Sequence, residues 1–351
     1  MGNFICFANP RFLEKAISTA TYGNFGQGSE QQLWSILRDI IAIKPGDAIF
    51  FYETEKKYFH GVFEAISEPF VCNDNLFNEG DETYPFRFHF RRRVNFTTNV
   101  PQFEFIHLID KKIIWSISTL AKDPTSPFRS IVNISNRERD ALIQLFLKYN
   151  IATGQTVPVN KIQTKIDQRI EAIDIISGKE LPNTETAIDV NVLPVAGSKK
   201  KPVCRYEFAL QAFFAYHLSR RTKIAVNVMG NYNESLTEVP LSAAELRRID
   251  ILCTHQQEGK NEPLFYHLVE LKPRVIYSLE RLRQLIGYLR MFSQKKAVEF
   301  GDVIGSIIAP DYTEDTINYL QERALVETEK PIRLIKYVLN QEGHILFNMA
   351  V

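Results

Sequence analysis

The sequence predicts a mixed α/β (α+β) chain made of two domains: a small β-barrel with helices, then an α-β-β-β-α-β sandwich. Three observations predict this. The chain has 351 residues, more than one hydrophobic core usually serves. With 45% hydrophobic and 24% charged residues, its composition is that of a globular protein. From Thr153 to about Pro202 it loses aromatic residues and gains Thr, Asn, Pro, Gly and Ser, which is typical of a connection between domains.

We therefore expect domains at residues 1–150 and 201–351, joined by a helix and linker at 151–200, with the helix near 162–176. In the first domain, alternating or continuous apolar patterns predict strands at 3–8, 48–52, 58–66 and 86–94. Helices fit 10–19, 30–40 and 136–149. Ser135 can cap the last helix, because Glu138 follows three residues later, as a capping box requires. The sheet is expected to curl into the small barrel.

In the second domain, the pattern predicts a helix at 206–218, strands at 224–229, 247–252 and 266–272, a helix at 279–292 and a strand at 303–308. Two of these strands carry charges amid apolar residues. Glu270 and Lys272 are two residues apart, so they share one face of their strand, and Asp250 lies in the preceding strand. Ionised side chains are excluded from cores unless they are paired or bound to metal, which predicts a divalent cation here.

This order of elements and residues resembles the PD-(D/E)XK nuclease superfamily over residues 200 to 345, and most of all its mismatch-directed and restriction-type members. Ile249 stands where the motif often has proline. The resemblance implies that Asp250, Glu270 and the Leu271 carbonyl bind Mg²⁺, with Mn²⁺ as a substitute. The roles it implies for the other residues are these: Lys272 orients or helps deprotonate the attacking water, Glu207 binds metal directly or through water, and Gln284 positions the water or a phosphate.

Simpler interpretations of the charged residues remain open. Asp250 is also explained as a strand-end acid paired with Arg247 or Arg248, and Glu270 as part of a solvated ion ladder with Lys272 or Arg274.

The first domain resembles the EVE and YTH-like branch of the PUA superfamily, through residues 23–26, 44–52, 60–65 and 84–88. This implies a reader that encloses a flipped, modified base in an aromatic cage. Phe25 stands where tryptophan is usual. Extrusion of a base must be offset by stacking and by hydrogen bonds to its edge. The candidates for stacking are Phe25, Trp34, Tyr52 and Trp115, and those for the base edge are Asn9 and Asn24. Each aromatic residue is also explained as core.

Composition restricts the expected cellular location, the state of the cysteines and the mode of DNA binding. There is no basic-plus-apolar leader and no run of eighteen apolar residues, so we expect a cytoplasmic protein with no membrane partner. The four cysteines are scattered, which favours buried thiols over a zinc site or disulfides. A net charge of +1 argues against coating of DNA, but a local basic surface suffices for a specific enzyme.

Together, the two resemblances imply a modification-dependent restriction endonuclease that acts on double-stranded DNA with a modified base, with phage defence or repair as the setting. One active site per chain predicts a homodimer for cutting both strands. Two alternatives stay open: a repair or mismatch-directed nuclease, and a non-catalytic nucleic-acid-binding protein.

Overall fold

The computed structural model describes residues 1–77, 82–94, 96–117, 130–151, 185–198, 201–242, 247–256, 263–274, 276–322 and 332–349. The chain divides into two compact units. Unit 1 comprises Met1–Trp115 and Ala121–Ile188, and unit 2 comprises Ser116–Leu120 and Asp189–Val351. The predicted helix at 162–176 lies outside the described residues. None of the helices in the described part of the chain has the length and hydrophobicity needed to span a bilayer.

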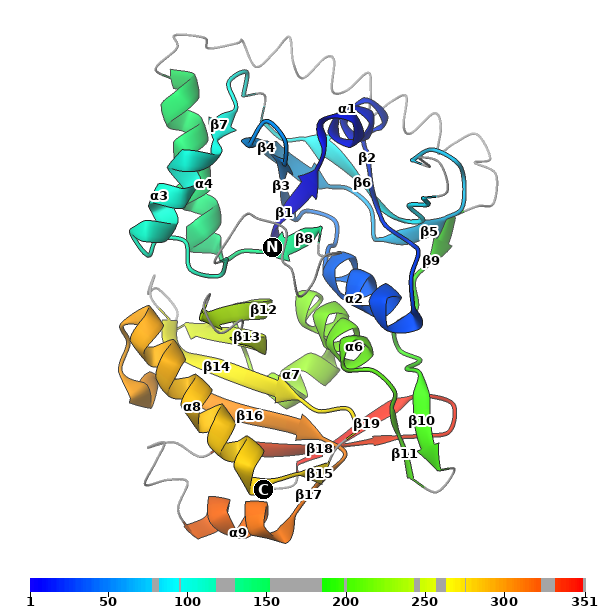
Figure 1. The fold of residues 1–351 in the computed structure, drawn as a ribbon, viewed down its shortest axis with the longest axis vertical. Helices are drawn as coiled ribbons and strands as arrows, with labels where there is room; N and C mark the ends of the chain where they lie inside the picture. The colour runs from blue at the N-terminus through cyan, green and yellow to red at the C-terminus, as the bar shows by residue number, and fades with distance from the viewer. Residues whose placement is uncertain are drawn as a thin grey trace. The chain divides into compact units, whose positions relative to one another are not determined.

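Unit 1 is built on one mixed sheet (Figure 1). Its strands are β1 (Asn3–Ala8), β2 (Thr21–Asn24), β3 (Ala48–Glu53), β4 (Tyr58–Ala65), β5 (Phe70–Cys72), β6 (Phe86–Arg92), β7 (Val100–Pro101), β8 (Ile131–Asn133) and β9 (Glu185–Ala187). They pair in the order β8-β1-β3-β4-β6-β5-β9, with β2 on β6 and β7 on β4. This order does not return to its start, so the predicted small barrel is not closed among the described strands.

Among the described residues of unit 1, four helices accompany this sheet: α1 (Pro10–Thr19), α2 (Glu30–Ile41), α3 (Gln102–Asp110) and α4 (Asn136–Ile151). The predicted capping box of α4 is present. Glu138 accepts a hydrogen bond from the backbone N–H of Ser135 at 2.7 Å, and the Ser135 hydroxyl accepts from the Glu138 N–H at 3.3 Å. Glu138 also accepts from the Trp115 N–H, so one buried carboxylate satisfies two backbone donors.

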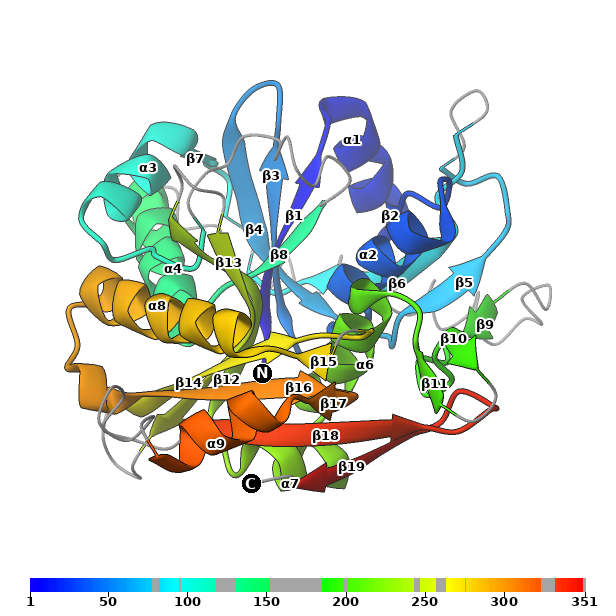
Figure 2. The same cartoon turned by 60° about the horizontal axis from the view of Figure 1, so that its bottom comes forward.

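Unit 2 contains a six-stranded sheet in the order β12-β13-β14-β16-β18-β19. The strands are β12 (Glu234–Ser242), β13 (Arg247–Gln256), β14 (Pro263–Leu271), β16 (Val303–Ala309), β18 (Arg333–Leu339) and β19 (Ile345–Met349). Neighbours from β12 to β14 are antiparallel, β14, β16 and β18 are parallel, and β19 returns antiparallel. The helices are α6 (Glu207–Ser219), α7 (Lys223–Met229), α8 (Leu279–Lys296) and α9 (Glu314–Glu322), with a short 3₁₀ turn, η1 (Phe300–Asp302). In Figure 2, α8 and α7 lie on opposite faces of the sheet.

The strand predicted at 224–229 is wrong, because these residues form α7. The alternation of Ile224, Val226 and Val228 favours a strand, but Ala225, Val228 and Met229 are buried at helical spacing. The Thr222 side chain caps the helix by accepting from the Ala225 N–H. The first strand of the sheet is instead β12, so the order α-β-β-β-α-β is kept with a different first strand.

Three smaller pairings complete the description. Residues 185–187 of the predicted linker form β9, which pairs with β5. Residues 195–198 form β10 (Val195–Ser198), which pairs with β11 (Lys201–Cys204), and β15 (Ile276–Tyr277) pairs with β17 (Asp311–Tyr312). All four cysteines are buried thiols.

Candidate functional site

The sheet of unit 2 places acidic residues of three strands at adjacent positions. Ile251 of β13 lies opposite Val269 of β14, so the next position along places Asp250 opposite Glu270. In β12, the neighbours of Glu238 lie opposite the neighbours of Asp250, which places Glu238 on its other side. Because side chains alternate along a strand, the three carboxylates share one face.

Asp250 is held by a hydrogen bond at each oxygen. Its Oδ1 accepts from Nε2 of Gln211 at 2.8 Å, and its Oδ2 accepts from the backbone N–H of Leu271 at 2.6 Å. Only 7% of Asp250 is exposed. Two bonds at opposite oxygens fix the plane of the carboxylate, because neither oxygen can rotate away without losing a partner.

Lys272 follows the last residue of β14 and lies between two carboxylates. Its Nζ is 2.9 Å from Oε1 of Glu270 and 3.2 Å from Oε2 of Glu207. The Lys272 backbone N–H donates to the Ile308 carbonyl of β16, which continues the sheet by one residue. Glu207 is the first residue of α6, where the helix dipole favours a negative charge. Glu270 keeps one oxygen, Oε2, that is buried and has no hydrogen-bond partner.

Helix α8 brings a tyrosine beside Glu270. The Gln284 Nε2 donates to the Tyr288 hydroxyl at 2.6 Å, one turn along the helix. Burial raises the pKa of Tyr288, and the charge of Glu270 raises it further. An amide nitrogen donates hydrogen bonds and does not accept them, so the Tyr288 hydroxyl does not donate its own proton to the Gln284 Nε2.

The electrostatics of the cluster follow from burial. Burial raises the pKa of Asp250 well above its usual range, and the neighbouring Glu270 raises it further. Burial also raises the pKa of Glu270, although Lys272 opposes this shift. For Lys272, burial alone would lower the pKa, but the charges of Asp250, Glu270 and Glu207 outweigh it, and the pKa is raised above its usual value. The same three charges therefore favour the protonated form of Lys272 in the metal-free protein.

The donor set fits a hard cation. Asp250 and Glu270 supply carboxylate oxygens, and the Glu270 Oε2 has no partner within the protein. In the described part of the chain, no three His, Cys, Asp or Glu side chains are grouped closely enough to hold an ion alone. Mg²⁺ does not need such a cage, because it usually keeps several waters and uses one or two carboxylates together with substrate phosphates. Asp250 and Glu270, with the Leu271 carbonyl as predicted, would hold it.

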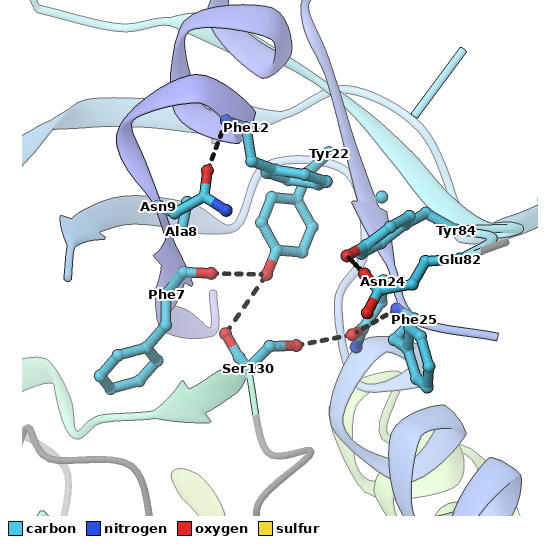
Figure 3. A pocket seen from close by; sticks show the side chains of 11 residues that line it. Phe7, Ala8, Asn9, Phe12, Tyr22, Asn24, Phe25, Glu82, Tyr84 and Ser130 are labelled. Atoms are coloured by element: carbon cyan, nitrogen blue, oxygen red, sulfur yellow. Dashed lines mark hydrogen bonds between the residues drawn. The ribbon is translucent and has the colours of Figure 1, made fainter. Parts of the chain in front are cut away.

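Unit 1 contains a pocket of about 310 Å³ next to β1 and α1 (Figure 3). Ligand sites in proteins commonly have volumes of about 300 to 1,000 Å³. The lining combines aromatic and polar side chains; it comprises Phe7, Ala8, Asn9, Phe12, Tyr22, Gly23, Asn24, Phe25, Glu82, Tyr84 and Ser130. The rings of Phe25 and Tyr84 are edge to face at 5.8 Å, and those of Phe12 and Tyr84 lie 5.3 Å apart.

Asn24 lines this pocket and has an amide donor without a partner. Its Oδ1 accepts from the Phe25 N–H at 2.9 Å and from the Ser130 hydroxyl at 2.6 Å, which fixes the orientation of the amide. The Nδ2 is buried and has no partner. Asn9 is oriented in the same way, because its Oδ1 accepts from the Phe12 N–H and caps α1. In each residue, the amide oxygen therefore accepts a hydrogen bond from within the protein, and the amide nitrogen remains able to donate to a ligand.

Half of the predicted base-binding residues line this pocket: Asn9, Asn24 and Phe25 do, and Trp34, Tyr52 and Trp115 do not. Tyr52 is buried in the core, where its ring contacts those of Phe7 and Phe59. Trp115 is also buried, and its backbone binds Glu138. Trp34 is half-buried on α2.

No protein-family model matches the sequence, and no curated protein matches it. Solved structures that match part of the chain include a repair endonuclease from Pyrococcus abyssi, 19% identical with a TM-score of 0.22, over 28% of this chain and 38% of the endonuclease. Human THYN1 protein, solved with DNA containing 5-methylcytosine, is 17% identical with a TM-score of 0.27, over 42% of this chain and 98% of THYN1. A Pseudomonas putida protein is 12% identical with a TM-score of 0.28, over 41% and 99% of the two chains.

The sequence left several residues of these sites unnoticed. Gln211 stands in an apolar helix one turn after Glu207, and that spacing was the available signal. Glu238 lies in a strand that was not predicted. In unit 1, Phe12, Tyr22 and Tyr84 line the pocket, but only pairing of β2 with β6 brings Tyr22 near Tyr84, and that pairing is not visible in local patterns.

Proposed function

We propose that this chain is a metal-dependent DNA endonuclease that reads a modified base with residues 1–150 and hydrolyses a phosphodiester with residues 201–351. One observation carries the proposal: buried Asp250 and Glu270 lie with the partly buried Lys272 and the more exposed Glu207, and the Glu270 Oε2 is unpartnered. Burial of two acids costs stability, and Lys272 offsets only part of that cost, so a functional role is the better explanation.

The residues of the chain have separate tasks in this proposal. A divalent cation, when bound, stabilises charge on the phosphate and lowers the pKa of water. Protonated Lys272 donates to the attacking water or a phosphate oxygen, and Glu207 and Glu270 hold its ammonium in place. Gln284 orients the Tyr288 hydroxyl so that its proton can reach a phosphate oxygen.

The pocket of unit 1 supports base reading. A flipped base would stack on Phe25 or Tyr84, and the Asn24 Nδ2 would donate to an acceptor on its edge. A buried donor without a partner costs about 1–3 kcal/mol, which such a ligand would recover. DNA is preferred over RNA as substrate because the nuclease superfamily resembled by residues 200 to 345 mostly acts on DNA. In this proposal, a homodimer cuts both strands of the duplex, and the reaction serves to restrict modified phage DNA.

Asp250→Ala separates the candidate functions. If the protein is an endonuclease, the Asp250→Ala variant still binds modified duplex DNA but no longer cleaves it. If the unaltered protein binds DNA but cuts no duplex with Mg²⁺ or Mn²⁺, the chain is a binding protein. If it cuts only mismatched or damaged duplexes, it is a repair nuclease.

A further inference from the structure

Gln211 of α6 connects two acidic side chains that belong to different strands. Its Nε2 donates to Asp250 Oδ1 at 2.8 Å and to Glu238 Oε1 at 2.9 Å. A primary amide nitrogen carries two hydrogens, so both bonds form at once. Gln211 is fully buried, with Leu210 and Ala212 buried on either side of it in the chain. The two bonds account for a polar side chain in an otherwise apolar helix segment.

Glu238 is held in an unusual backbone conformation. Its φ is +56°, in the left-handed region, although β12 stays paired with β13 on both sides of it. For a residue with a Cβ this conformation is strained, so the surrounding contacts must maintain it. Its second oxygen, Oε2, lies 3.6 Å from Nη1 of Arg248. Glu238 is thus fixed between Arg248 and Gln211.

We propose that Gln211 is a positioning residue for the Asp250 carboxylate, and that Glu238 in turn positions Gln211. The inference rests on the proposed function, since it concerns the cation site of Asp250 and Glu270. The Gln211 amide fixes Oδ1 of Asp250 while the Leu271 N–H fixes Oδ2, and each oxygen keeps a lone pair for a cation. Partners that orient a ligating carboxylate typically matter 10–100-fold, at order of magnitude, for metal affinity.

Calorimetric titration of the full chain with Mn²⁺ alone, at one pH, tests this. Gln211→Met keeps the length of the side chain and removes the donor, and it is expected to weaken Mn²⁺ binding by about 10–100-fold. Glu238→Gln keeps an acceptor for the Gln211 amide and is expected to stay within about threefold of the unaltered protein. Phe213→Leu changes a buried residue of the same helix that packs on Phe347, and it should lower the unfolding temperature without changing Mn²⁺ affinity.

A Gln211→Met protein that loses stability like Phe213→Leu, yet binds Mn²⁺ within about twofold of the unaltered protein, would overturn the proposal. If Gln211→Met does not fold, Glu238→Ala tests the same link, because it removes the Glu238 Oε1 acceptor from the Gln211 Nε2. About tenfold weaker binding is then expected, and unchanged binding contradicts the proposal.

Metal-free crystal structures separate this inference from the proposed function. If the unaltered protein binds no Mn²⁺, the cation site is wrong, but the structures still decide the role of Gln211. In Gln211→Met, the Asp250 carboxylate is expected to turn and to lose its bond from the Leu271 N–H. A carboxylate that keeps its orientation shows that Gln211 does not position it.

Discussion

The ammonium of Lys272 lies 2.9 Å from Oε1 of Glu270, two residues earlier in the chain, with both side chains on one face at the end of β14. The same ammonium reaches Glu207 at the start of α6. The site therefore contains more carboxylates than cationic side chains. This excess of negative charge favours the protonated form of Lys272, and it also favours binding of a second cation beside Lys272.

Lys272→Met is expected to lower the stability of the metal-free protein by about 1–3 kcal/mol, because it leaves Glu270 buried without its cation. Addition of Mn²⁺ should recover part of this loss. Urea unfolding with and without Mn²⁺ measures both effects. Lys336→Met, which removes an ion pair between half-exposed side chains, is the control and should cost less than about 1 kcal/mol. Equal losses in the two variants would contradict the account of Lys272.

Glu270→Gln is expected to lower the rate of duplex cleavage at least about a hundredfold while DNA binding persists, because it removes a charge from the reacting centre. Single-turnover cleavage and a filter-binding assay measure the two quantities separately. Glu104→Gln, on α3 of unit 1 and outside both candidate sites, is the control for a lost carboxylate. A rate that falls only in proportion to binding would argue against a role in chemistry.

Asn24→Leu is expected to weaken binding of modified duplex DNA by about 1–3 kcal/mol, because a donor to the base is lost from the pocket. Cleavage at saturating DNA should change little. Trp34→Phe serves as the control, since Trp34 does not line the pocket. A larger effect of Trp34→Phe than of Asn24→Leu would place the base-binding surface elsewhere.

Stability should fall in acid because of His267. Burial lowers its pKa to about 3, and its Nε2 lies 2.7 Å from the Ser306 hydroxyl. An unfolded histidine titrates near about 6.5, so the contribution of the buried neutral ring is present above that pH and is lost as pH falls toward 3, by about 1.4 kcal/mol per unit.

Urea midpoints at several pH values between 7 and 4.5 measure this slope. In His267→Gln the decline should be shallower, whereas the exposed His344→Gln should follow the unaltered protein. Parallel curves for all three proteins would contradict the assignment.

Local patterns were enough to predict much of this fold. The helix predicted at 10–19 and the strand at 3–8 have the observed bounds, because apolar periodicity and a capping asparagine act over a few residues. Helix α7 was mistaken for a strand, since its β-branched residues alternate and the tertiary contacts of Ala225 and Met229 decide its form. The barrel predicted for residues 1–150 was wrong for the same reason: whether a sheet closes depends on long-range strand pairing, which periodicity does not record.

In the candidate sites, too, contacts set by local spacing could be predicted and contacts set by long-range packing could not. The spacing of Glu270 and Lys272 along one strand predicted their contact. The amide bridge from Gln211 to Asp250 and Glu238 depends on how α6 meets two strands, and no spacing along the chain encodes it. Tyr52 and Trp115 were chosen for their rings, but burial placed both in the core, where aromatic residues contribute most to stability.

The most direct test of the central claim is cleavage of matched duplexes, one unmodified and others carrying methylated cytosine, hydroxymethylated cytosine or methylated adenine, with Mg²⁺ and with a chelator. The account predicts that one modified duplex is cut, that the unmodified duplex is not, and that the chelator stops the reaction. Failure to cut any of them by a folded protein, or cutting that continues in chelator, would contradict it.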